Sequence, residues 1–296
     1  MPELQSPDQL SIDGILAAIA VFDGKYKRTE VNAAIAHREE IVPRLIEVLE
    51  GVLANPEKVA EDETYFAHTY ALMLLGHFRE TRAHRAIVAL SSLRRDLPYR
   101  LFGDTITEDL GVILFRTCNG SFEAMKGLVQ DRAADDYCRG AAAKAITYGV
   151  VEGIVPREEA LSFLGGLFEE GVADASGAFY DMIACCVQDL YPEEMMERIE
   201  AAYAEGFIHS GYIDFDSFRR ALSKGKERCL LDLRAELEQR SLDDVHKSMS
   251  WWACFQERPQ QPILARPIDK KVTKDKRKKA RSKIGKASRK RNRQKK

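Results

Sequence analysis

The chain has 296 residues, of which 45% are hydrophobic and 31% are charged, and its formal net charge is −1. This length can bury a sizeable core without disulfides, and the composition excludes a collagen, a disulfide mini-protein and a membrane protein. The charge is unevenly distributed, because residues 266–296 hold 17 lysines and arginines and 2 aspartates, a net of +15. Residues 1–265 therefore carry 28 basic and 44 acidic residues, a net of −16.

Helical patterns dominate from the N-terminus onwards. Apolar residues recur at helical spacing along most of the chain, and no run alternates with period two for long enough to predict a sheet. Ser6 followed by Pro7 predicts the start of the first helix, with Ser6 as its N-cap. Further helices are expected over residues 30–37 and 43–54. Residues 1–62 are thus predicted to form N-terminal helices that cap a stack of repeats.

From residue 63 the predicted helices come in pairs joined by short turns. The turns fall at residues 79, 120, 156 and 192, which gives spacings of 41, 36 and 36 residues. Helix pairs with this period are typical of an α-solenoid in the HEAT and armadillo range, in which each pair buries its apolar face against its neighbours. The pairs are expected over residues 64–77 and 80–94, 105–118 and 121–131, 137–152 and 157–170, and 178–190 and 193–204.

Two further features belong to this stack of repeats. The small residues from Gly140 to Ala143 would let two helices of the stack approach closely. After the repeats, Asp214 or Asp216 begins a helix to about residue 239, and a cap at Ser241 begins a last one. The repeats and the C-terminal capping helices together occupy residues 63–258. Four apolar residues at helical spacing are expected to close the C-terminal end of the stack: Val245, Met249, Trp252 and Phe255.

The remaining residues form a different kind of segment. Pro259, Pro262 and Pro267 mark a linker, and the chain beyond them is mostly Lys, Arg, Ser, Ala and Gln. Such a composition has too little apolar surface to offset the entropy of ordering. Residues 259–296 are therefore predicted to be a Pro-containing linker and a disordered Lys/Arg-rich tail. The predicted fold class is all-α: a HEAT-like α-solenoid of stacked helical hairpins with a disordered basic C-terminal tail.

Four segments of the chain resemble an uncharacterised bacterial family, a domain of unknown function with a HEAT-like helical body. They are Phe102–Gly111 (FGDTITEDLG), Tyr137–Glu159 (YCRGAAAKAITYGVVEGIVPREE), Asp189–Glu194 (DLYPEE) and Met249–Phe255 (MSWWACF). The resemblance covers roughly residues 10–255 and implies no assigned activity. Several family members append a cysteine-rich zinc-binding module after the helical body. The last cysteine of this chain is Cys254, so the resemblance implies no zinc site.

The cysteines and the N-terminus favour a reduced, cytoplasmic protein. The first fourteen residues contain three acids and no Lys or Arg, so the apolar run from Ile15 to Phe22 lacks the positive region of a secretory signal. None of the six cysteines forms a C-x-x-C pair, and most lie in apolar helical patterns. The vicinal pair Cys185–Cys186 could be redox-active, but neighbours on a helix point about 100° apart, which favours core packing. We expect no cofactor and no membrane contact.

Few residues suggest catalysis or metal binding. Glu80 and His84 share a helix face and could supply two metal ligands, but two ligands do not make a site. His68 and His77 lie on opposite sides of one helix. Acidic clusters at predicted helix N-termini are expected to act as caps, and Thr105–Glu108 resembles a capping box. No nucleophile-elbow, Walker, Rossmann or H-E-x-x-H pattern occurs. No catalytic and no metal-ligating residue is therefore predicted.

The basic tail is the strongest functional signal. Its cations suit attraction to a phosphate backbone, but it lacks the aromatic rings needed for base stacking. Trp251 shares its face with Asp244 and Lys247 and is predicted to be an exposed aromatic contact. The predicted nucleic-acid contacts are Lys270, Lys271, Lys274, Lys276, Arg277, Lys278, Lys279, Arg281, Lys283, Lys286, Arg289, Lys290, Arg291, Arg293, Lys295 and Lys296.

The leading hypothesis is a non-enzymatic interaction or scaffold protein. Its solenoid groove would bind a protein or peptide, and its tail would tether it to RNA or to a ribonucleoprotein such as the ribosome. One alternative is an enzyme, or an enzyme-associated subunit, with a site between helices near Glu80 and His84. Another is a self-associating protein whose tail binds its own acidic body. The tail could also serve only to keep the chain soluble or as a targeting signal.

Overall fold

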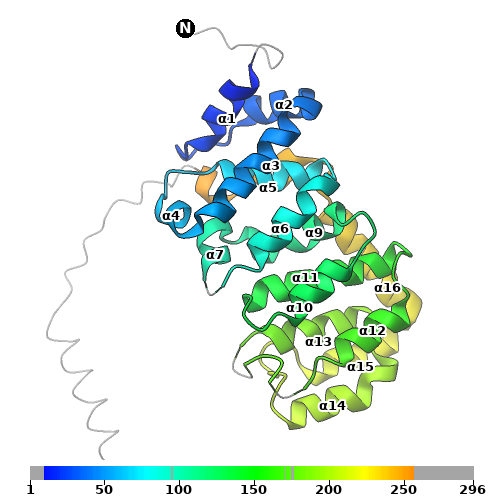
Figure 1. The fold of residues 1–296 in the computed structure, drawn as a ribbon. Helices are drawn as coiled ribbons and strands as arrows, with labels where there is room; N and C mark the ends of the chain where they lie inside the picture. Colours follow the sequence, from blue (N-terminus) through cyan, green and yellow to red (C-terminus); the bar gives the residue numbers. More distant parts are fainter. Residues whose placement is uncertain (1–9, 95, 170, 175–176, 257–296) are drawn as a thin grey trace, which may run out of the picture. The chain divides into compact units, whose positions relative to one another are not determined.

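The protein is described by a computed structural model that covers residues 10–94, 96–169, 171–174 and 177–256. Within these ranges every regular element is helical, apart from two isolated bridges, Val21–Tyr65 and Arg94–Ala134 (Figure 1). The predicted all-α class is therefore confirmed for this part of the chain. The basic tail and all of its predicted nucleic-acid contacts lie outside the described residues. None of the described helices is long and apolar enough to cross a membrane.

The helices follow one another along the chain with short connections. The α-helices are α1 (Ile12–Ala20), α2 (Arg28–Ala36), α3 (Arg38–Ala54), α4 (Pro56–Glu61), α5 (Ala67–His77), α6 (His84–Ser91), α7 (Leu97–Phe102), α8 (Thr105–Glu108), α9 (Leu110–Thr117), α10 (Glu123–Gln130), α11 (Asp136–Val151), α12 (Arg157–Gly165), α13 (Phe179–Asp189), α14 (Met196–Ala204), α15 (Phe215–Lys224), α16 (Lys226–Gln239) and α17 (Val245–Met249). The short 3₁₀ helices are η2 (Thr81–Ala83), η3 (Glu193–Met195) and η4 (Ala253–Phe255).

The predicted helix pairs correspond to α5 with α6, α9 with α10, α11 with α12, and α13 with α14. A residue with positive φ follows the first helix of each pair, which turns the chain sharply into the second helix. These residues are Arg79 (φ 54°), Asn119 (φ 51°), Gly153 (φ 72°) and Tyr191 (φ 65°). All four predicted turns lie in the connections between paired helices.

Several predicted boundaries are wrong. The first helix begins at Ile12, where the Ser11 hydroxyl accepts from the Gly14 N–H at 3.2 Å. The predicted cap at Ser6 lies outside the described residues, and Leu10 and Ser11 are not helical. The single helix predicted over 105–118 is divided into α8 and α9, and α4 and α7 were not predicted. The helix predicted to run to residue 239 is divided at Gly225 (φ 84°), a backbone conformation that a helix cannot continue through.

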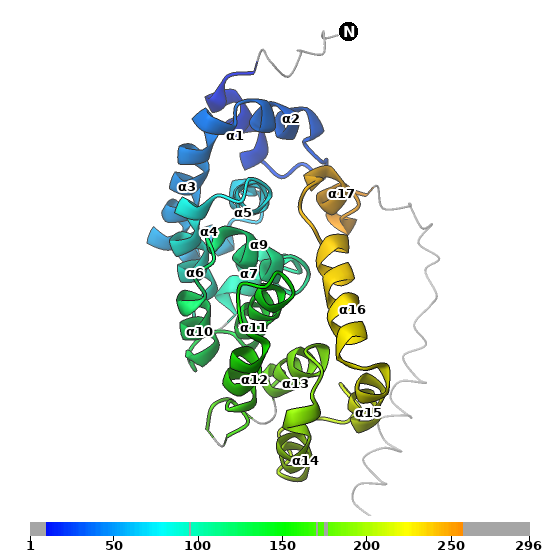
Figure 2. The same cartoon turned by 90° about the vertical axis from the view of Figure 1, so that its right-hand side faces the viewer.

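The first helices of the pairs form a row through the middle of the body. Helix α5 contacts α9, α9 contacts α11, and α11 contacts α13. The second helices α6, α10 and α12 lie along one side of this row (Figure 2). Helix α5 is buried from Ala67 to Gly76, and most of α11 is buried. A helix that is buried around its whole circumference needs neighbours on every side, so a further layer must cover the other side of the row.

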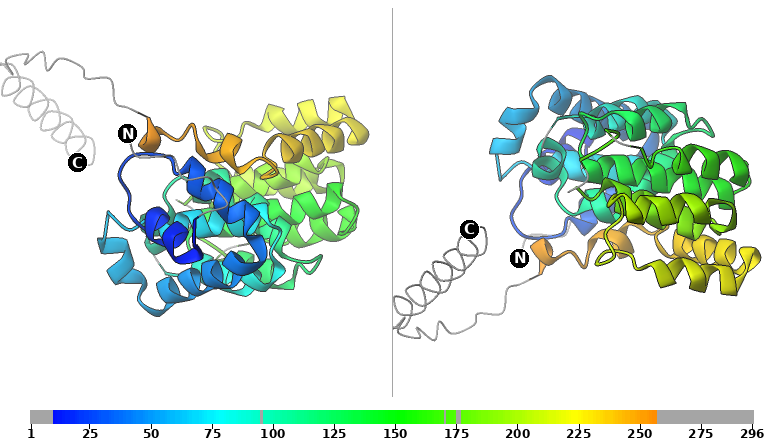
Figure 3. Two further views of the ribbon diagram at one scale, coloured as in Figure 1. Left: turned by 90° about the horizontal axis from the view of Figure 1, so that it is seen from above. Right: turned by 90° about the horizontal axis from the view of Figure 1, so that it is seen from below.

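That further layer is the return segment, which we define as residues 226–255. Helix α16 contacts α11 and α13, and α17 contacts α5. The segment therefore runs back along the row towards the N-terminal helices, as Figures 2 and 3 show in yellow to orange. With fourteen residues, α16 alone spans about 21 Å at 1.5 Å per residue.

The predicted closure of the C-terminal end is wrong as a consequence. The Phe255 ring lies 5.5 Å from that of Tyr26 and 5.9 Å from that of Phe66, both near the N-terminus. His246 accepts from the Tyr26 hydroxyl at Nδ1 and donates to Asn32 Oδ1 at Nε2, each at 2.8 Å. The apolar stripe of the return segment thus completes the N-terminal half of the core.

Three buried arginines join neighbouring helices through hydrogen bonds to backbone carbonyls. The Arg116 guanidinium donates to the carbonyls of Gly76 and His77 at the end of α5, at 2.8 and 3.0 Å. Arg139 donates to the Val129 carbonyl near the end of α10 at 2.9 Å, and Arg157 donates to the carbonyls of residues 190 and 191 after α13. The last carbonyls of a helix have no partner within it, so each arginine satisfies acceptors that would otherwise be buried unpaired.

Candidate functional site

A cleft of about 370 Å³ lies between the helix row and α16. Its lining contains small residues at which the helices of the row approach one another closely. A Cβ atom on Gly140 would lie 2.4 Å from the Met182 sulfur, and one on Gly111 would lie 3.3 Å from the Ala141 carbonyl oxygen. The close approach predicted from the small residues is thus present. The lining residues are Ile106, Thr107, Glu108, Gly111, Val112, Tyr137, Gly140, Ala141, Lys144, Tyr148, Met182, Cys185, Cys186, Asp189, Tyr212, Glu236 and Arg240.

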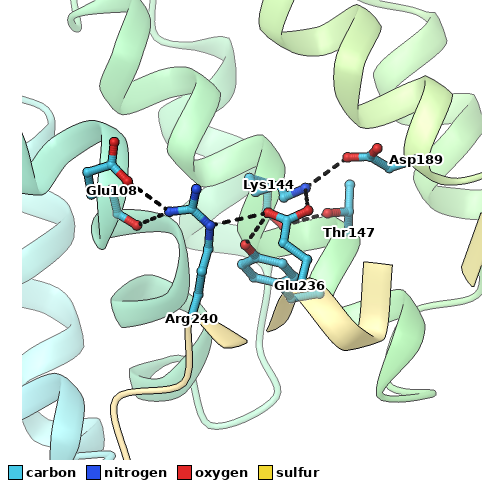
Figure 4. A network of polar contacts seen from close by, with 7 residues as sticks. Glu108, Lys144, Thr147, Asp189, Glu236 and Arg240 are labelled. Atoms are coloured by element: carbon cyan, nitrogen blue, oxygen red, sulfur yellow. Dashed lines mark hydrogen bonds and ion pairs between the residues drawn. The ribbon is translucent and has the colours of Figure 1, made fainter. Parts of the chain in front are cut away.

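Lys144 lines this cleft and joins three helices through polar contacts (Figure 4). Its ammonium on α11 lies 2.8 Å from Asp189 Oδ2 of α13 and 2.8 Å from Glu236 Oε2 of α16. The Tyr148 hydroxyl donates to the other oxygen of Glu236 at 3.2 Å. Burial opposes the charged form of Lys144, but the two carboxylates outweigh it and hold its pKa above the ordinary value. Lys144 is therefore a charged bridge rather than a neutral nucleophile.

Arg240 extends the same network towards α8. Its guanidinium donates to the Glu108 carbonyl at 2.7 Å and to the Glu108 carboxylate at 3.2 Å, and it lies 3.5 Å from Glu236. Burial, together with the charge of Glu108, raises the pKa of the neighbouring Asp109 to about 7. The predicted capping box is wrong, because Thr105 lies inside α8 and no side chain caps that helix. Glu108 pairs with α16 instead.

An acidic hollow of about 550 Å³ adjoins the cleft. The buried carboxylate of Asp181 accepts from the His209 backbone N–H at 2.7 Å and lies 3.0 Å from His209 Nδ1. Tyr137 and Tyr212 line both the cleft and the hollow, and both rings are exposed. The hollow is lined by Asp135, Asp136, Tyr137, Gly177, Ala178, Asp181, His209 and Tyr212, so its described lining contains no lysine or arginine.

His68, His77, His84 and Glu80, which were considered as metal ligands, each contact a different partner. His68 and His77 contact the carbonyls of Leu101 and Leu242, at 2.6 and 2.7 Å. The Glu80 carboxylate accepts from the Arg82 guanidinium at 2.7 and 3.0 Å, whereas His84 Nδ1 lies 2.9 Å from the Thr117 hydroxyl. Across the described ranges, no three His, Cys, Asp or Glu side chains are grouped so that they could hold a metal ion.

The two adjacent tryptophans and the two adjacent cysteines that the sequence analysis considered differ in their exposure. Trp251 is exposed, as predicted, whereas Trp252 stacks on Phe255 with ring centroids 5.9 Å apart. Cys186 is buried, and Cys185 is half-buried in the lining of the cleft. Burial raises the pKa of the Cys185 thiol to about 12, so this thiol stays protonated at neutral pH.

Sequence reasoning missed the Lys144 network, although one signal for it is present. Lys144 is the only charged residue between Gly140 and Val151. A lone charge inside an apolar, mostly buried helix requires a nearby partner of opposite sign. Nothing in the sequence distinguishes Glu236 from the other acids of α16. Three of the four segments that carry the family resemblance meet at this cleft, through Glu108, Lys144 and Asp189 respectively.

Comparisons with known proteins agree with that resemblance. The model of a protein family of unknown function, DUF1186, matches residues 10–256. An uncharacterized protein of Chlamydia trachomatis serovar D is 27% identical over 244 residues, which are 82% of this chain and 96% of that protein. An uncharacterized protein of Chlamydia muridarum is also 27% identical over 244 residues, which are 97% of its length. No solved structure matches.

Proposed function

The chain belongs to the DUF1186 family, and from this premise we propose that it is a non-enzymatic interaction or scaffold protein of the cytoplasm. The cleft between the helix row and α16 holds a segment of a protein partner. The observation that carries this proposal is the convergence of three of the four family-resembling segments on the cleft, through residues of α8, α11 and α13. A binding role suits the chemistry, because Lys144 is held in its charged form and the Cys185 thiol stays protonated.

The body is proposed to be a HEAT-like α-solenoid. The support is the recurrence of helix pairs whose first members pack side by side and end at residues with positive φ. Solenoids bind partners along an extended face. In this chain the return segment covers much of one side of the row, so the proposed binding site is narrowed to the cleft beside α16.

Site-directed photo-crosslinking in cells tests the proposal. A photoreactive amino acid would replace Tyr212, which lines the cleft and is 55% exposed, or Tyr99, which is 57% exposed on α7 and does not line it. We expect a discrete, light-dependent adduct with a protein partner from position 212 and none from position 99. The purified partner should then bind the full chain, and Tyr212→Ala should weaken that binding. Equal adducts from both positions, or none from position 212, would contradict the proposal.

The basic tail is proposed to tether the chain to RNA or to a ribonucleoprotein. Its support is compositional, since residues 266–296 carry a net charge of +15. If six to ten of these cations engage single-stranded RNA, log affinity should fall against log salt with a slope of about −4 to −7. Labelled RNA and DNA would be titrated with the full chain and with a chain ending at Ala265, which retains all described residues.

We expect the salt-dependent affinity to disappear with the tail. An unchanged slope would contradict the tether. A further outcome is that neither chain binds RNA while removal of the tail changes the oligomeric mass in sedimentation. That result would assign the tail to self-association instead of an RNA tether. A matched full chain, with the tail cations replaced by glutamine, controls for the loss of chain length.

A further inference from the structure

We call the cleft and the adjoining acidic hollow together the recess. They share two exposed rings, those of Tyr137 at the start of α11 and Tyr212 in the connection before α15. On the cleft side, the rings adjoin an apolar floor that includes Gly140 and Met182. On the other side they adjoin three aspartates. The recess therefore offers apolar surface, aromatic faces and carboxylates.

The charges of this recess are unbalanced. The cations of the cleft are already engaged, since Lys144 bridges two carboxylates and Arg240 pairs with Glu108 and Glu236. The hollow has no lysine or arginine in its described lining. Two of its carboxylates are held in position: Asp181 by the backbone N–H of His209, and Asp135 by the Tyr137 N–H at 2.9 Å. Asp136 lies 3.4 Å from the guanidinium of buried Arg139, and Asp181 lies 3.0 Å from His209 Nδ1. The three carboxylates therefore face a single arginine, which leaves the hollow with an excess of negative charge.

We infer that this recess binds an extended basic segment of the protein partner, with a lysine or arginine side chain lying against Tyr137 and Tyr212. The inference rests on the proposed function and names its partner chemistry. Aromatic faces attract a cation held within about 6 Å of the ring centroid, and the aliphatic stems of lysine and arginine pack on apolar surface. The charge of such a side chain lies towards Asp135. An acidic body of net charge −16 also attracts basic partners at long range.

The same charges disfavour three other kinds of partner in the recess. A nucleic-acid backbone or an anionic lipid headgroup would bring negative charge against the aspartates of the hollow. An acidic peptide would meet the same repulsion. A basic protein segment is the partner that both the carboxylates and the tyrosine rings favour.

Peptide binding to the full chain tests the inference. The probe is a fluorescein-labelled peptide of about eight residues that alternates arginine with alanine, a length that spans at most about 28 Å when extended. A matched peptide replaces each arginine by glutamine. Fluorescence anisotropy at near-physiological salt, where the Debye length is about 8 Å, limits attraction by the distant charges of the body. We expect binding of the arginine peptide and none of the glutamine peptide.

Variants that leave the net charge of the protein unchanged distinguish peptide binding in the recess from electrostatic attraction to the acidic body as a whole. The double variant Tyr137→Ala/Tyr212→Ala should weaken the arginine peptide about tenfold, which equals about 1.4 kcal/mol. The corresponding double change to phenylalanine keeps both rings and should retain the affinity. Tyr99→Ala, at an equally exposed ring outside the recess, should change the affinity less than twofold.

The outcomes distinguish this inference from the proposed function. Unchanged affinity in the double alanine variant, or an equal loss in Tyr99→Ala, would mean that diffuse charge holds the peptide and would overturn the inference. Photo-crosslinking from position 212 does not depend on the charge of the partner. A crosslinked partner without basic residues at the crosslinked site would overturn the basic-segment inference while the proposed function stood.

Discussion

Replacing Lys144 by methionine is expected to lower the free energy of unfolding by about 3 kcal/mol, the lower end of the cost of removing one partner of a buried ion pair, because Lys144 and its partners are half-buried. The Lys144 ammonium lies 2.8 Å from each of Asp189 and Glu236, so the variant would leave two carboxylates in the cleft without a cation. Denaturant unfolding at fixed pH measures the change. Hydrogen exchange should also accelerate in α16, because Lys144 joins this helix to α11 and α13.

Lys126 provides a matched control within the same chain. It also bridges two carboxylates, Glu123 at 3.1 Å and Glu159 at 2.9 Å, and its side chain is 23% exposed against 22% for Lys144. Its partners, however, are 81% and 53% exposed, whereas those of Lys144 are 28% and 35% exposed. Because exposed ion pairs contribute at most about 1 kcal/mol, Lys126→Met should cost no more than that.

A compensating variant tests the physical cause of the Lys144 effect. If the cost comes from uncompensated carboxylates, then adding Asp189→Asn and Glu236→Gln to Lys144→Met should restore most of the stability. If it comes from lost packing of the lysine stem, the triple variant should remain as unstable as the single one. Equal losses in Lys144→Met and Lys126→Met would contradict the assignment of Lys144 as a bridge between half-buried carboxylates.

Local sequence patterns were sufficient to predict the helix pairs and their turns. The apolar stripes of the paired helices and the short interruptions between them depend on residues close in sequence. The turns at Arg79, Asn119 and Tyr191 could be located in this way, even though none of the three is a glycine. Each must adopt a left-handed conformation because the chain reverses direction there.

The path of the return segment depends on contacts that no local pattern encodes. The apolar spacing of the stripe containing Phe255 does not specify which end of a stack of helices it packs against. The deciding partners, Tyr26 and Asn32, lie more than two hundred residues away. The break at Gly225 was also missed, because the apolar spacing continues on both sides of it. The cleft is formed by α16 against the row, so it could not be predicted without that path.

Arg139 of α11 holds the end of α10 through a buried hydrogen bond. Replacing Arg139 by methionine should lower the free energy of unfolding by about 3 kcal/mol or more, since each buried acceptor left without a donor costs about 1–3 kcal/mol. The guanidinium donates to the carbonyls of Val129 and Val172, at 2.9 and 3.0 Å, and lies 3.6 Å from the centroid of the Phe179 ring. Methionine retains much of the apolar volume, so the loss reports mainly the polar contacts. Thermal and denaturant unfolding measure it.

Arg219 has the same local neighbours without the burial. It pairs with Asp216 three residues earlier, as Arg139 pairs with Asp136, and it lies 4.9 Å from the Phe215 ring centroid. Its side chain is 66% exposed, against 1% for Arg139, so Arg219→Met should change stability by less than about 1 kcal/mol. Arg139→Lys keeps the charge but has no planar fork to reach two separate carbonyls, and it should therefore remain strongly destabilised. Full recovery by lysine would show that charge alone holds α10 against α11, and would contradict the role assigned to the guanidinium.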